Sequence, residues 1–86
     1  MSPADQKKWQ IITENIETKN DNDLRVDSEL KDLSPEMHEL IREAYLKTRM
    51  ENRNGRGFLA FLIARDLKTI EDVKFLGEIY QEALLL

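Results

Sequence analysis

The single histidine of this 86-residue sequence, His38, is the first residue whose type could support chemistry. A histidine can ligate a metal or act as a base beside a nucleophile. A metal site on a helix needs a second ligand one turn away, but the residue four positions on is Arg42. No plausible nucleophile stands near it in the sequence either. We therefore expect His38 to be an exposed helix residue with no catalytic or metal-binding role.

Three glutamates share one face of a predicted helix and could in principle form an acid–base pair: Glu36, Glu39 and Glu43. Such a pair works only where burial separates the two pKa values. The face that carries these residues is strongly polar, so we expect it to lie in solvent. We predict no catalytic residue here.

The acidic segment between residues 21 and 32 matches a calcium-binding loop in its number of aspartates. When the loop pattern is started at Asp21, the fifth ligand position is Arg25 and the required glycine is Val26. A cation beside the calcium and a valine at the sharp turn both exclude that site. We expect no metal and no cofactor.

The last group is a glycine-rich turn, Gly55-Arg56-Gly57, which leads into an apolar segment. Such a turn at the start of a helix can present backbone N–H groups to an anion. No strand precedes it and no Lys-Ser or Lys-Thr pair follows, so it is not a nucleotide-binding loop. Arg49 and Arg53 lie nearby in the sequence. The candidate contact residues for an anion or a partner are therefore Arg49, Arg53, Gly55, Arg56 and Gly57.

Composition limits the class of protein further. The net charge of −4 is uneven, with −5 in residues 1–40, +3 in 41–66 and −2 in 67–86. We expect the charge of the basic middle to be paired within the chain or solvated, with a dedicated binding surface as the alternative. The lack of cysteine excludes disulfides and thiolate zinc sites. No apolar run approaches the roughly 20 residues that cross a bilayer, and no secretory signal is recognisable, so we expect a cytoplasmic protein without membrane contact.

Local helix signals predict an all-α fold that positions these groups. Ser2-Pro3 and Ser34-Pro35 each combine a preferred N-cap with a preferred first helical residue. Thr69 and Asp72 have the spacing of a capping box. With the apolar spacing, these signals predict a bundle of four helices at about residues 3–18, 35–52, 58–67 and 70–84.

Residues 19–33 form a long connection in this prediction, with Leu24, Val26, Leu30 and Leu33 tucked onto the core and a short helical turn near Ser28–Asp32 as an option. The uninterrupted apolar run 58–64 predicts that the third helix is central and buried. Gly55 is expected to end the second helix in the left-handed conformation.

The last predicted helix carries more apolar residues than one buried face needs. We expect its core face to comprise Val73, Leu76, Tyr80, Ala83 and Leu84, widened by Phe75 and Ile79. Gly77, in mid-helix, is expected to allow a close helix crossing. The three terminal leucines either pack on the body, meet a second chain or mark a cut in a longer sequence. The candidate self-association residues are therefore Tyr80, Leu84, Leu85 and Leu86.

Together these patterns predict a single helical domain, complete or part of a larger protein, with a non-enzymatic function. We expect an interaction or regulatory module that binds a protein partner, with a homodimer through the last helix as one form. One alternative is an accessory protein that binds nucleic acid or phosphate through the Arg–Gly turn and Arg65, although the acidic net charge argues against it. Another is an acidic inhibitor of the antitoxin or immunity type that masks a basic partner.

Overall fold

The computed structural model describes residues 1–18 and 23–85, and these residues form helices and no strand. The first helix, α1, spans Pro3–Thr18, as predicted. Its start is fixed by Ser2, whose Oγ accepts a hydrogen bond from the Asp5 backbone N–H at 3.1 Å. Ile11 and Ile12 are the buried apolar residues that this helix supplies to the core.

The connection after α1 contains a short helix, α2, at Arg25–Glu29, which begins three residues before the short helical turn considered at residues 28–32. Residues 19–22 of the predicted connection lie outside the described residues. Leu30 and Leu33 are buried, as expected, whereas Leu24 is 82% exposed and the expectation for it is wrong. Asp32 has a positive φ of 50°, a conformation that aspartate tolerates better than most residues.

The third helix, α3, spans Pro35–Lys47 and ends five residues before the predicted bound. Ser34 caps its start by accepting from the Met37 N–H at 3.2 Å. At its end, the Thr48 N–H donates to the carbonyls of Ala44 and Tyr45, and residue 48 leaves the helical conformation.

The fourth helix, α4, spans Arg53–Arg65 and begins five residues before the predicted Phe58. Asn52 is the reason, because its side-chain Oδ1 accepts from the Gly55 N–H at 2.9 Å and starts the helix there. Gly55 therefore lies inside the first turn of α4, and no glycine among the described residues has a positive φ. The prediction that Gly55 ends the preceding helix is wrong.

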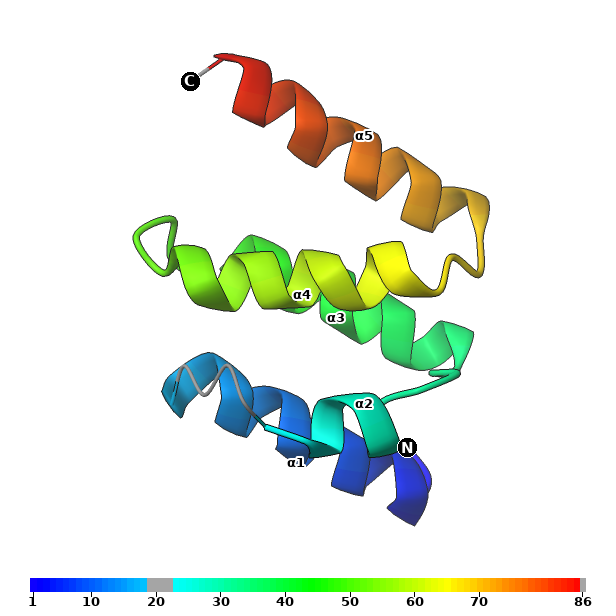
Figure 1. Ribbon diagram of the computed structural model, residues 1–86. Helices are drawn as coiled ribbons and strands as arrows, with labels where there is room; N and C mark the ends of the chain where they lie inside the picture. Colours follow the sequence, from blue (N-terminus) through cyan, green and yellow to red (C-terminus); the bar gives the residue numbers. More distant parts are fainter. Residues whose placement is uncertain (19–22, 86) are drawn as a thin grey trace.

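Helix α4 is the central helix of the bundle, as predicted. It contacts α1, α3 and α5, and buries Leu59, Leu62 and Ile63. Burial is not complete around its axis, since Phe61 is 41% exposed. The last helix, α5, spans Ile70–Leu85 and lies along one side of the molecule, with α1 and α2 on the opposite side of the α3–α4 pair (Figure 1). One face of α5 is therefore covered by α3 and α4, and the other is not.

Candidate interaction surface

A closed polar cluster joins α3 to α5 at His38 and Asp72, both of which are fully buried. His38 Nδ1 lies 2.8 Å from Asp72 Oδ2, and Arg42 Nη1 donates to Asp72 Oδ1 at 2.5 Å. A carboxylate can only accept, so the His38 proton sits on Nδ1. The expectation that His38 is exposed is wrong, because Asp72 gives it a buried partner 34 positions along the chain.

Asp72 also starts α5, as its capping-box spacing predicts. Its Oδ2 accepts from the backbone N–H groups of Lys68 at 2.9 Å and Thr69 at 3.3 Å, while its own N–H donates to Thr69 Oγ1. Burial alone would raise the pKa of Asp72. The N–H of Lys68 together with His38 and Arg42 outweighs burial and lowers it. Asp72 is therefore a buried, ionised carboxylate held by four donors.

This cluster has the residue types of an acid–base site but not the access. His38 Nε2 is buried and has no hydrogen-bond partner among the described residues. With His38 and Asp72 fully buried, no substrate atom can reach either group in this conformation. The cluster holds α5 against α3, which is a structural role. The three glutamates considered for acid–base work, Glu36, Glu39 and Glu43, are exposed, as expected.

The Arg–Gly segment forms the start of α4 and is not a separate turn before a helix. The Gly55 N–H is already bound to Asn52, and a Cβ at Gly55 would stand 2.6 Å from Asn52 Nδ2. Gly57 is exposed within α4, and no heavy atom lies within 4 Å of a Cβ built there. Gly55 thus makes room for the helix cap, and Gly57 lies on the surface of α4.

Arg56 is an internal support of the fold. Its guanidinium lies 4.0 Å from the centroid of the Tyr45 ring and donates to the carbonyls of Tyr45 at 3.1 Å and Thr48 at 3.0 Å. It therefore gives carbonyls at the end of α3 a side-chain donor. Arg56 Nη2 lies 3.8 Å from Oε2 of Glu82 in α5.

The remaining arginines of the basic middle are mostly paired, as its charge pattern predicts. Arg49 lies 3.5 Å from Glu51 on the surface. Arg53 and Arg56 line one groove of about 670 Å³ beside α5, but Glu51 and Glu82 line the same groove. The structure thus brings Arg53, Arg56 and Gly57 together, leaves Arg49 outside the groove, and balances the positive charges with acids.

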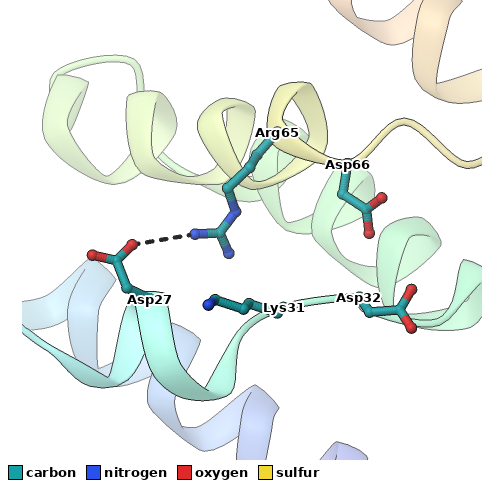
Figure 2. A pocket seen from close by; sticks show the side chains of 5 residues that line it. All are labelled: Asp27, Lys31, Asp32, Arg65 and Asp66. Carbon is teal, nitrogen blue, oxygen red and sulfur yellow. Dashed lines mark ion pairs between the residues drawn. The ribbon is translucent and has the colours of Figure 1, made fainter.

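A second pocket, of about 440 Å³, is lined by charged residues of the α2 region and the end of α4 (Figure 2). Arg65 points into it and lies 3.5 Å from Asp27, and it also donates to the Leu30 carbonyl. Asp32 and Asp66 stand at the other end of the pocket (Figure 2). Both pair with Lys68, which lowers the pKa of Asp32. The pocket is thus lined by residues that form ion pairs, and the Arg65–Asp27 pair joins α4 to α2. No three carboxylates or histidines among the described residues gather as metal ligands.

The uncovered face of α5 carries an apolar row that we call the outer stripe: Ile70, Val73, Gly77, Tyr80 and Leu84. Its four side chains are between 50% and 69% exposed. The predicted core face was wrong for Val73, Tyr80, Ala83 and Leu84, all of which are exposed. The core face of α5 instead presents buried Asp72 and Phe75, flanked by half-buried Leu76 and Ile79. The Phe75 and Tyr45 rings pack edge to face, with 5.1 Å between their centroids.

The self-association candidates follow this division. Tyr80, Leu84 and Leu85 are exposed, and Leu86 lies outside the described residues. Gly77 is exposed, and a Cβ there would meet no heavy atom within 4 Å. The expected close crossing at Gly77 is therefore absent within the described part of this chain.

Comparison with known proteins gives no relative, since no family model, curated protein or solved structure matches the chain. Within residues 1–18 and 23–85, no helix combines the length and apolar character needed to cross a membrane. The chemistry of its own surfaces is therefore the basis for any functional argument.

Proposed function

We propose that this chain is a small, non-enzymatic helical interaction module that binds a protein partner through the outer stripe of α5. The observation that carries the proposal is the stripe itself. Its residues follow the spacing i, i+3, i+7, i+10 and i+14, which places them on one side of a helix. A helix that buries its opposite face in the core and leaves such a row in water has a surface suited to a second helix or groove.

The alternatives gain less support from the geometry. Phosphate binding would need free arginines and free N–H groups, but Arg56 and the Gly55 N–H are engaged inside the protein. An acidic inhibitor would need free acids near the N-terminus. Several of these meet cations of this chain: Arg25 lies 2.9 Å from Glu14 and 2.6 Å from Asp23, and Lys7 lies 3.3 Å from Glu29.

Site-specific photo-crosslinking in cells of the native host tests the proposal. A photo-reactive phenylalanine analogue replaces Tyr80 in one version and Leu24 in the other. Leu24 is a matched control, because it is an exposed apolar residue of the α2 region, on the side of the bundle away from α5. We expect a discrete protein adduct from position 80, whether with another protein or with a second copy, and none from position 24. The absence of any adduct at position 80 would remove the proposal.

A further inference from the structure

The outer stripe reads almost the same in both directions from Gly77, to within one residue. Ile70 and Leu84 lie seven residues before and after it, and Val73 and Tyr80 lie four before and three after. A twofold symmetric interface uses the same patch on both subunits, so that residue i meets j while j meets i. Resting on the interaction function proposed above, we infer that the partner is a second copy of this chain. The two α5 helices run antiparallel and cross at Gly77.

This arrangement gives each stripe residue an apolar counterpart. A twofold axis near Gly77 brings together residues that lie at equal or nearly equal distances before and after it, seven and seven for Ile70 and Leu84 and four and three for Val73 and Tyr80. Ile70 then packs against Leu84 of the second copy, and Val73 packs against Tyr80 of the second copy. All four side chains are half or more exposed in the single chain, so each has apolar surface to lose on pairing.

Gly77 supports the same arrangement independently. Glycine weakens the interior of a helix relative to alanine, and here nothing in the single chain requires it, because a Cβ would have open space. At a helix crossing, the distance between the axes is set by the side chains at the contact. A glycine at the centre of the stripe allows the two backbones to approach closely, which accounts for its presence.

The charges beside the stripe do not oppose an antiparallel pairing. Lys74 and Gln81 occupy the flank of the stripe that faces away from the core. In an antiparallel pair, each flank meets the same flank of the other helix, as in coiled coils of that direction. Lys74 therefore lies opposite Gln81 of the second copy and one turn from its Glu78, so that no like charges face each other.

The size of this surface sets the strength of the dimer. The 16 residues of α5 span about 24 Å, so one helix crossing falls in the low size class of specific interfaces, below about 1,200 Å² in total. Interfaces of that class are weak and reversible, and we expect a Kd on the order of 10 μM. Each copy carries a net charge of −4, so added salt should strengthen the pairing by screening repulsion.

Sedimentation equilibrium of the purified full chain, over concentrations that bracket this Kd, tests the inference. We expect a monomer–dimer equilibrium whose Kd rises by about 100-fold or more in Tyr80→Glu, because a charge then enters the centre of the crossing. Leu24→Glu is the matched control and should dimerise like the parent chain. Circular dichroism of both variants checks that the fold is intact.

The substitution Gly77→Leu distinguishes a specific helix crossing from nonspecific hydrophobic association. It should raise the melting temperature measured at a concentration where the chain is monomeric, because leucine is a better helix former and has open space there. It should also raise the Kd for dimerisation by about tenfold or more, because its side chain holds the two backbones apart. A Kd that fell in Gly77→Leu would overturn the crossing, because added apolar surface would then be what drives association.

Disulfide trapping tests the direction of the helices in a chain that has no cysteine of its own. Ile70→Cys and Leu84→Cys chains, mixed and oxidised gently, should form the mixed disulfide in preference to either symmetric one. Preferential symmetric bonds would overturn the antiparallel arrangement. A strict monomer at every concentration would overturn the inference, while an adduct between position 80 and a different host protein would leave the interaction function standing.

Discussion

Replacing Asp72 with asparagine should destabilise this protein more than any other change from a carboxylate to an amide. The substitution keeps the shape of the side chain but removes its charge and one acceptor atom. At present Oδ2 serves His38 and two backbone N–H groups, and Oδ1 serves Arg42. An asparagine oxygen can replace only one of these acceptors, and its NH₂ group then faces another donor.

The expected loss follows from burial. Breaking a buried ion pair by removing one partner costs about 3–5 kcal/mol, because the other charge is left without compensation. A chain of 86 residues has a total stability of about 4–13 kcal/mol. At this chain length each kcal/mol shifts the melting temperature by about 5 °C, so Asp72→Asn should melt about 15–25 °C below the parent chain.

Urea and thermal unfolding, followed by circular dichroism, measure this loss. Glu71→Gln is the matched control, since it removes an exposed carboxylate from the same first turn of α5. Its loss should stay below about 1 kcal/mol, the usual limit for a surface charge near a helix start. If Asp72→Asn were no more destabilising than Glu71→Gln, the buried cluster would not be what fastens α5 to α3.

Three further predictions concern pH and the α3–α4 junction. The pKa of Asp72 is lowered in the folded state, so the ionised carboxylate stabilises the fold above the unfolded pKa of about 3.9, and this contribution is lost as pH falls through the folded pKa. The difference in unfolding free energy between the parent chain and Asp72→Asn, measured in urea, should therefore shrink in acid. A difference that widened in acid would contradict the lowered pKa. Arg56→Lys should cost about 2 kcal/mol in urea unfolding, because lysine loses the paired carbonyl bonds and the ring contact, whereas the control Arg53→Lys, at an exposed site in the same turn, should change little. Asn52→Ala should cost about 1 kcal/mol by removing the α4 cap. Gly55→Ala should be nearly neutral in the parent chain, where it displaces that cap, yet stabilise Asn52→Ala by about 1 kcal/mol; equal effects in the two backgrounds would contradict the contact between them.

The sequence was a good guide wherever structure depends on neighbouring residues. Ser2, Ser34 and the Thr69–Asp72 box start their helices as predicted, because a cap is a local hydrogen bond between residues two or three apart. The error at α4 was also local. Asn52 is a strong N-cap, but the glycines after it suggested a turn, and the cap prevailed.

The burial of His38 could not be predicted, since its partner Asp72 is distant in sequence and an aspartate is almost never fully buried without a partner. The face of α5 was ambiguous for a different reason. Its apolar residues form two rows, one through Phe75 and one through Tyr80, and each row alone satisfies helical periodicity. The contacts of Asp72 and Phe75 with α3 decide which row is buried, and these long-range contacts cannot be predicted from the spacing of apolar residues in α5.

The position of Asp72 has a consequence for how this protein opens. One carboxylate both holds the first turn of α5 and anchors that turn to α3, so undocking the helix and unravelling its start are a single event. Amide protons near the start of α5 should therefore exchange only when the whole core unfolds. Among the described residues, the last turns are held by the packing of half-buried Ile79 on the core and the 3.8 Å contact of Glu82 with Arg56, and they can fray and reform alone. The N-terminal turn of α5 is thus fixed to the core, whereas its C-terminal turns open independently.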